Sequence, residues 1–97
     1  MTPQKSQIPR EEAEILAISA LGFLASESER LQRFIDLSGL DLAAIRSGAT
    51  NSAFLGGILD HLLADESLLL VFAEEHQIRP ERIAQLRRKL PGASLDF

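Results

Sequence analysis

The apolar residues of this chain recur every three or four positions, and this helical spacing is the feature that most constrains its fold. The recurrence is broken at short intervals by Ser, Gly, Asn and Pro, residues that commonly start or end helices. No segment alternates apolar and polar residues over the length of a β-strand, and the abundant Leu and Ala favour helix. The sequence therefore predicts an all-α fold, a compact bundle of about six short helices.

The six expected helices cover residues 9–25, 27–38, 42–47, 52–63, 66–76 and 80–90. The first helix is predicted to bury a stripe that consists of Ile15, Leu16, Ile18, Leu21, Phe23 and Leu24. The second helix is predicted to bury Leu31, Phe34, Ile35 and Leu37. Each helix is too short to be stable alone, so packing between helices must hold the fold together.

Polar residues and glycine predict where the helices begin and end. Ser26 and Glu29 fit a capping box, in which each side chain binds a free backbone amide at the start of the second helix. Gly39 suits the left-handed position that follows the last turn of that helix. The other predicted caps are Asp41, Asn51 or Ser52, and Asp65, and Pro80 takes the first position of the last helix.

A shift of 38 residues superimposes the first three expected helices on the last three. Leucines of the first helix then fall on leucines of the fourth, and Gly39 meets Gln77 at a break in both halves. Short helical units of this kind are stabilised by packing against a copy. The pattern predicts two pseudo-twofold-related three-helix units, at residues 12–49 and 50–87. The alternative is that compact helical hairpins resemble one another without being repeats.

A length of 97 residues fits one domain, which we expect at residues 10–90. Residues 1–9 are expected to be a mobile N-terminal tail and residues 91–97 a C-terminal tail. No apolar run approaches the ~20 residues that span a bilayer, and none has the place and length of a signal peptide. The chain contains no cysteine, which removes thiolate chemistry and fits a reducing compartment. We expect a soluble cytoplasmic protein with no membrane partner.

The fifth expected helix is apolar on a side where its counterpart in the first half is polar, because Leu70 and Val71 align with Gln32 and Arg33. A helix that is apolar almost all round is usually central and buried, and we expect burial here. The alternative is that Leu70 and Val71 form a face for a homodimer.

Two adjacent glycines, Gly56 and Gly57, lie inside the fourth expected helix. Glycine costs a helix interior about 1 kcal/mol relative to alanine, so the pair needs a structural reason. Close approach of another helix is the favoured interpretation, and a local kink is the alternative.

The segment LDHLLADE, residues 59–66, is the strongest candidate for a chemical site. His61 and Asp65 are four residues apart and could share a helical face as metal ligands do. Asp65 is expected to cap the next helix, however, and neither His61 nor His76 belongs to a Glu-x-x-His or His-Glu-x-x-His motif. We therefore predict no metal ligands, and we expect His61 to cover the edge of the apolar face at a corner between helices.

Catalytic motifs are also missing from the sequence. The serines cluster at helix ends, where capping explains them, and there is no Gly-x-Ser-x-Gly or phosphate-binding loop. We assign no catalytic or cofactor-binding residues and expect no cofactor. A metal-dependent or hydrolytic enzyme is the least favoured class of function.

The charge distribution supplies the one distinctive electrostatic feature. The net charge is −4 and the isoelectric point near 5.1, yet half of the ten basic residues lie between positions 79 and 89. These candidate partner-binding residues are Arg79, Arg82, Arg87, Arg88 and Lys89. Their predicted partner is a protein, which makes the chain an interaction or structural protein. The alternative is a regulator that contacts nucleic acid through the helix at 79–89, although that helix offers few base-reading side chains.

Two runs carry a resemblance to a known family: ALGFLASESERLQRFIDLSGLDLAAIR and FLGGILDHLLADESLLLVFAEE. They resemble a family of small uncharacterised alphaproteobacterial proteins that is known only as a domain of unknown function. The resemblance covers about residues 12–90, and its most specific marks are residues 20–25, 38–40 and 62–66. It implies an all-helical fold and a bacterial cytoplasmic location, and it carries no catalytic residues to this chain.

Overall fold

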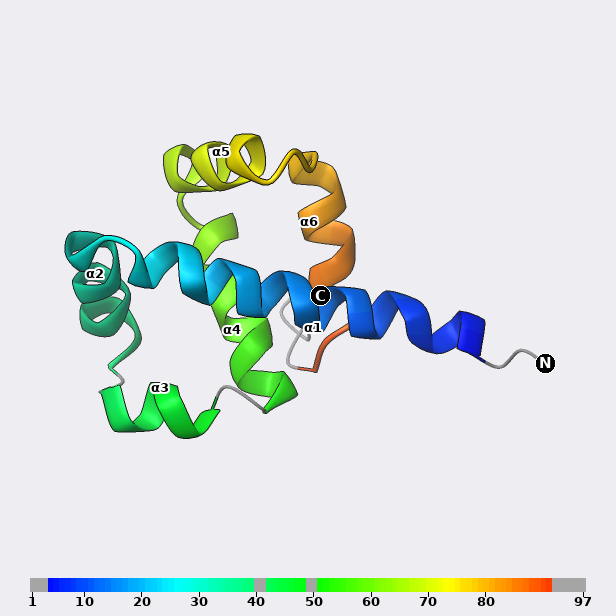
Figure 1. The fold of residues 1–97 in the computed structure, drawn as a ribbon, viewed down its shortest axis with the longest axis horizontal. Coiled ribbons are helices and arrows are strands. Elements are labelled where there is room, and N and C mark those ends of the chain that lie inside the picture. The colour runs from blue at the N-terminus through cyan, green and yellow to red at the C-terminus, as the bar shows by residue number, and fades with distance from the viewer. Residues whose placement is uncertain (1–3, 40–41, 49–50, 92–97) are drawn as a thin grey trace.

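Two crossing helices form the centre of the molecule, and the other helices lie around them (Figure 1). The computed structural model describes residues 4–39, 42–48 and 51–91. The central helices are α1 (Gln4–Ala25) and α4 (Ser52–Leu63). The surrounding helices are α2 (Ser28–Ser38), α3 (Leu42–Gly48), α5 (Glu66–Glu75) and α6 (Pro80–Arg87). Over these ranges the chain forms no strand, which confirms the predicted all-α fold.

The hydrophobic core lies where α1 and α4 cross and continues beneath α2, α5 and α6. α1 packs against α4, α2 and α6, and α4 also packs against α5 and α6. The rings of Phe23 and Phe72 meet edge to face with their centroids 5.2 Å apart, which joins α1 to α5. The radius of gyration of 13.2 Å matches the ~13 Å expected for a compact domain of about 100 residues.

The stripe that α1 buries differs from the predicted one. Its buried residues are Ala13, Leu16, Ala17, Ala20, Phe23 and Leu24. Ile15 and Ile18 point to solvent and are 65% and 51% exposed. Three of these residues are alanines, whose small side chains allow neighbouring helices to pack closely. Leu37 on α2 was likewise predicted to be buried and is 67% exposed.

The first helix also begins earlier than predicted. α1 starts at Gln4 and continues through Pro9, whereas the sequence indicated a start at Pro9. A proline within a helix removes one backbone hydrogen bond, so it often marks a start, but here the helix extends on both sides of it. The predicted mobility of residues 1–9 stays a prediction.

Several predicted helix ends are confirmed by their hydrogen bonds. The Asn51 side chain accepts from the amides of Ala53 and Phe54 at 2.8 and 3.1 Å, and the Asp65 side chain accepts from Leu68 at 3.2 Å. Pro80 begins α6 as predicted. Gly39 ends α2 in the left-handed conformation with φ of 75°, as predicted. The cap predicted at Asp41 lies outside the described residues.

The predicted capping box at the start of α2 is wrong. Its N-cap is Glu27, which makes no side-chain capping bond. Ser26 instead donates its hydroxyl hydrogen to the carbonyl oxygen of Phe23 at 2.7 Å, so it satisfies the end of α1. Only Ser26 and Glu27 separate α1 from α2.

The helix limits of the two halves correspond closely under the 38-residue shift. α1 and α4 end 38 residues apart, at Ala25 and Leu63, and the starts of α2 and α5 and of α3 and α6 are separated by the same interval. Gly39 and Gln77 both have positive φ, 75° and 53°. In Figure 1, α1, α2 and α3 run left, down and right, whereas α4, α5 and α6 run up, right and down. These correspondences support the pseudo-twofold repeat, which stays a prediction.

The expected burial of Leu70 and Val71 is wrong. They are 48% and 40% exposed, whereas Phe72 and Ala73, the next two residues of α5, are buried. The expectation assumed that α1 would lie on this face. α5 instead lies at the periphery and α1 packs on α4, so one side of α5 faces solvent (Figure 1). The alternative of a dimer face at Leu70 and Val71 stays a prediction.

Candidate functional site

The basic segment at residues 79–89 contains five cations and one acid, a net charge of +4 in a chain whose total is −4. It comprises α6 and the residues that flank this helix. The structure divides the five predicted partner-binding cations into one that is buried, one that is paired at the surface and three that are exposed. Each group has a different role.

Arg87 is the buried cation and holds the C-terminal end of α6 against α4. Its side chain is 7% exposed, and it donates from Nε and Nη2 to the two carboxylate oxygens of Asp60 at 2.6 and 2.9 Å. Its Nη1 donates to the carbonyl oxygens of Leu90 and Pro91, both at 3.1 Å. The guanidinium therefore makes its hydrogen bonds within the protein. The structure corrects the prediction that Arg87 is available at a partner-binding surface.

Gly56 explains how α4 accommodates this guanidinium. A Cβ at position 56 would lie 2.7 Å from Nη1 of Arg87 and 3.0 Å from the carbonyl oxygen of Pro91. Gly56 is thus closely approached, but by a side chain and a carbonyl oxygen and not, as the sequence had indicated, by the backbone of another helix. At Gly57 a Cβ would meet nothing within 4 Å, so that glycine has no such reason.

Arg82 is the surface-paired cation. It donates from Nη2 to the Glu12 carboxylate at 2.8 Å, which connects α6 to α1, and both side chains are nearly half exposed. Glu14, two residues after Glu12 on α1, accepts the hydroxyl hydrogen of Ser52 at 2.7 Å. Glu12 and Glu14 of α1 therefore bind residues of α6 and α4, respectively.

Arg79, Arg88 and Lys89 are the remaining cations. All three are exposed, and none forms an ion pair with another residue of the described ranges. Arg79 precedes α6 as its N-cap, and Arg88 and Lys89 follow the last residue of the helix. Within the part of the chain that the structure describes, these cations are the members of the predicted set that are free to meet a partner.

Residues 76–79 form the corner between α5 and α6. This corner places Arg79 beside apolar residues. The amide of Ile78 donates to the carbonyl of Ala73 at 3.0 Å and that of Gln77 to Glu74 at 3.3 Å, with Gln77 left-handed. This pair of bonds is a Schellman motif, which reverses the chain after a helix. The motif folds Ile78 back toward Ala73.

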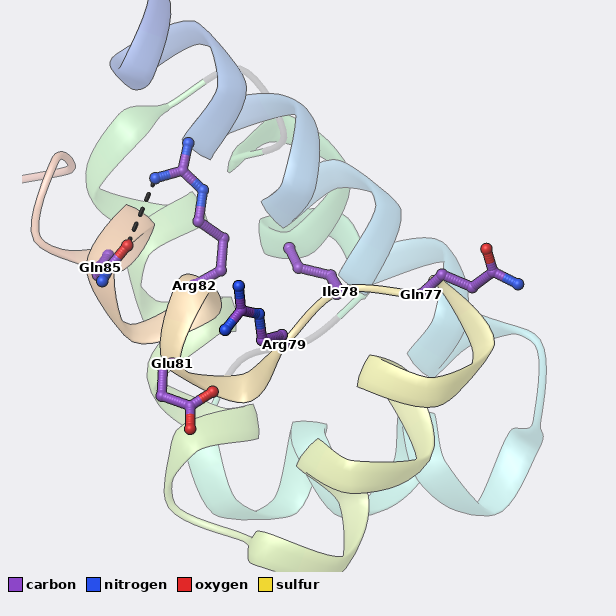
Figure 2. Close-up of a pocket in the computed structure, with 6 residues that line it drawn as sticks. All are labelled: Gln77, Ile78, Arg79, Glu81, Arg82 and Gln85. Carbon is purple, nitrogen blue, oxygen red and sulfur yellow. Dashed lines mark hydrogen bonds between the residues drawn. The ribbon is translucent and has the colours of Figure 1, made fainter.

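A shallow groove of about 700 Å³ lies on this corner. It is lined by Leu70, Ala73, Glu74, Gln77, Ile78, Arg79 and Pro80. Next to it, a second hollow of about 530 Å³ is lined by residues 77–79, 81, 82 and 85 (Figure 2). Figure 2 shows Arg79 and Arg82 extending on one side of the start of α6 and Glu81 pointing the other way. The two hollows share Gln77, Ile78 and Arg79, so the corner combines an apolar groove with cationic side chains.

The sequence did not predict this groove. Its residues come from the end of one helix, the loop and the start of the next, and no single-helix periodicity connects them. The sequence signals were Pro80, predicted to start a helix, and Leu70, which was expected to be buried.

His61 lies at the predicted corner between α4 and α5 and packs against Phe34 of α2. The two rings meet edge to face with centroids 5.0 Å apart, and Nε2 is buried with no hydrogen-bond partner. Burial lowers the pKa of His61 below its usual 6.5, Asp65 opposes this shift, and Arg33 adds to it. Asp65 is the cap of α5 rather than a ligand partner, and the described residues contain no group of three or more potential metal-binding side chains.

Comparison with known proteins identifies one family. A family model described as "Protein of unknown function (DUF3572)" matches residues 10–93. No curated protein and no solved structure matches the chain. Among the helices in the described ranges, none combines the length and the apolar character needed to cross a membrane.

Proposed function

We propose that this chain, which belongs to the DUF3572 family of proteins of unknown function, is a non-enzymatic interaction module that binds an acidic amphipathic helix of another protein. The proposed docking surface is the α5–α6 corner. The observation that carries the proposal is the groove in which Leu70, Ile78 and Pro80 lie beside Arg79, a cation without an ion pair in the described ranges.

The chemistry of the groove specifies the partner. Leu70 is 48% exposed and Ala73, Ile78 and Pro80 continue the apolar lining, so leucine-like side chains of a helix would lose contact with water there. Arg79 beside the groove favours carboxylates on the flank of that helix, and a net positive segment in an otherwise acidic chain favours one orientation of an acidic partner. Glu74 also lines the groove, so carboxylates are favoured on the Arg79 side only.

The same geometry disfavours the nucleic-acid alternative. Of the five cations that suggested it, Arg87 is buried and Arg82 is paired with Glu12. Three exposed cations are few for a phosphate backbone contact, and the groove beside Arg79 is lined mostly by apolar residues and contains Glu74. We also propose a bacterial cytoplasmic location, with which the lack of cysteine is compatible.

The test uses two synthetic amphipathic helices with the same leucine face, one with glutamates and one with lysines on the other face. The acidic peptide is expected to bind, with amide chemical-shift changes at Leu70 and Ile78, and to bind more weakly as salt rises. Arg79→Glu and Leu70→Asp should each weaken binding about tenfold, the effect of removing a contact of moderate strength.

Arg88→Glu is the matched control, because it reverses another exposed cation at the far end of α6 and should leave peptide binding within about twofold. Equal binding of the acidic and basic peptides, or no shift at the α5–α6 corner, would overturn the proposal. Steeply salt-dependent binding to a DNA duplex that is lost in both Arg79→Glu and Arg88→Glu would instead establish the nucleic-acid function.

A further inference from the structure

We infer that two copies of this chain associate through the outward face of α1, with the two helices antiparallel. This face is opposite the buried stripe and consists of Ile15, Ile18, Gly22 and Ala25, all exposed. Among the residues that the structure describes, the two isoleucines are two of the most exposed large apolar ones, and they lie on a helix whose other side is in the core. Over residues 15–25 the inward and outward faces of α1 are both apolar, and a helix segment of this kind is usually covered on both sides. The inference is independent of the function proposed for the α5–α6 corner.

The order of large and small residues on this face makes it complementary to itself. Ile15 and Ala25 lie five residues on either side of Ala20, and Ile18 and Gly22 lie two residues on either side. A helix turns about 100° per residue, so the four outward residues lie within an arc of about 80°. A twofold axis at the level of Ala20 therefore brings Ile18 of one copy onto Gly22 of the second copy, and Ile15 onto Ala25 of the second copy. Each large side chain meets a small one, as an isologous interface requires.

The charges favour this part of the surface for self-association. Both copies are acidic, with a net charge of −4, and would repel one another over most orientations. No charged residue occurs between Glu14 and Glu27, and Glu14 is engaged with Ser52. The outward face of α1 is thus an uncharged strip on which two acidic molecules can meet.

The size of the strip sets the expected affinity. Residues 15–25 span about 16 Å of helix, and a helix is about 10 Å wide, so the contact is much smaller than the ~800 Å² per partner of a stable interface. The dimer should therefore be weak and dependent on protein concentration. The same symmetry carries exposed Glu11 of one copy toward the α1–α2 corner of the second, where Glu27 and Glu29 are exposed. Salt should consequently strengthen the dimer, the opposite of its effect on the acidic peptide at the α5–α6 corner.

The test swaps the large and small residues at positions 18 and 22 and measures association by sedimentation equilibrium. Protein concentrations up to about 1 mM include the range of weak dissociation constants. The wild-type mass should rise from 10.7 kDa toward twice that value with concentration. Ile18→Ala and Gly22→Ile should each weaken association about tenfold, the first by losing the large side chain and the second by filling its place. The double variant I18A/G22I restores a large residue opposite a small one and should recover the wild-type constant within about threefold.

Gly22→Ile distinguishes specific packing from nonspecific hydrophobic association. It adds exposed apolar surface, which would strengthen nonspecific association, at a position where a Cβ meets nothing within 4 Å of the same molecule. Gly57→Ile is the matched control on another exposed helical glycine, and Leu70→Asp removes the groove residue without touching α1. Neither control should change the dimer constant. A monomer mass at every concentration, a stronger dimer in Gly22→Ile, or loss of the dimer in Leu70→Asp would each overturn the inference. A variant that lacks residues 92–97 tests whether this segment, and not a second copy, covers the outward face of α1. Dimerisation that appears only in this variant would also overturn the inference.

Discussion

The guanidinium of Arg87 makes two parallel hydrogen bonds to the carboxylate of Asp60 and so fixes the end of α6 against α4. The remaining nitrogen of Arg87 binds two carbonyl oxygens that follow the helix. One side chain, itself 7% exposed, therefore satisfies three acceptor groups. A charged residue that the sequence indicated as part of a binding surface is instead a structural connection between helices.

Replacing Arg87 by methionine should destabilise the protein strongly. The variant keeps much of the side-chain volume but leaves Asp60 and two carbonyls without their donor. Loss of one member of a buried ion pair costs about 3–5 kcal/mol, and because Asp60 is 44% exposed we expect about 2–4 kcal/mol here. Urea denaturation measures the difference. The control Arg88→Met alters an exposed neighbour and should stay within about 0.5 kcal/mol. Equal losses in the two variants would contradict the structural role of Arg87.

The two adjacent glycines of α4 should respond in opposite directions to alanine. Gly56→Ala places a Cβ 2.7 Å from Nη1 of Arg87, which its four hydrogen bonds hold in position, and should cost about 1–3 kcal/mol. Gly57→Ala meets nothing and should stabilise the protein by about 0.5–1 kcal/mol through helix propensity. Thermal unfolding of the pair provides the measurement. A stabilising Gly56→Ala would show that Arg87 moves aside freely.

The capping residues distinguish a true N-cap from a serine that only resembles one. Asn51 accepts two backbone amides at the start of α4, so Asn51→Ala should lower the free energy of unfolding by about 1 kcal/mol. Ser26 caps nothing at the start of α2, and Ser26→Ala should cost at most about 0.5 kcal/mol. Chemical denaturation under one set of conditions compares them. If Ser26→Ala were the more damaging change, α2 would depend on the predicted capping box after all.

The sequence and the structure agree most closely where short-range chemistry decides the outcome. Gly39, Asn51, Asp65 and Pro80 each act through backbone groups a few residues away, so their types and spacing were sufficient to locate the helix ends. The predictions of which helix faces are buried were less accurate. Periodicity indicates that a helix has an apolar side, but it does not indicate which neighbouring helix covers that side. Two sides of α1 have apolar residues at helical spacing, and the prediction did not count the alanines as core residues.

The candidate site required contacts that no local pattern contains. Arg87 and Asp60 are 27 residues apart, and Arg82 and Glu12 are 70 apart. In the sequence these arginines were equivalent to Arg79 and Arg88, since all lie in one basic segment. Only their three-dimensional partners separate the cations that hold the fold from those that remain at the surface.

The left-handed corner after α5 offers a matched comparison with the one after α2. Gly39 adopts positive φ at little cost, whereas the side chain of Gln77 disfavours the same conformation by about 1–2 kcal/mol. Gly39→Ala should therefore destabilise by about 1 kcal/mol, and Gln77→Gly should stabilise by up to about 1 kcal/mol after the greater chain entropy of glycine is included. Differential scanning calorimetry gives both values. A destabilising Gln77→Gly would mean that the Gln77 side chain makes a contribution larger than its backbone cost.

The pH dependence of stability should report on His61. Burial against Phe34 lowers its pKa in the folded state, so the unfolded chain takes up a proton at a higher pH than the folded one. Stability linked to this group is therefore fully present above the unfolded pKa of about 6.5 and declines as the pH falls below it toward the folded pKa. His61→Phe replaces the imidazole by a ring that cannot be protonated, and it should flatten the dependence between about pH 7.5 and 5.5. Urea midpoints of the two proteins across this interval measure the effect. A wild-type stability that rises on acidification through the same interval, and does so only when His61 is present, would require the opposite shift and would contradict the buried, unpartnered state of Nε2.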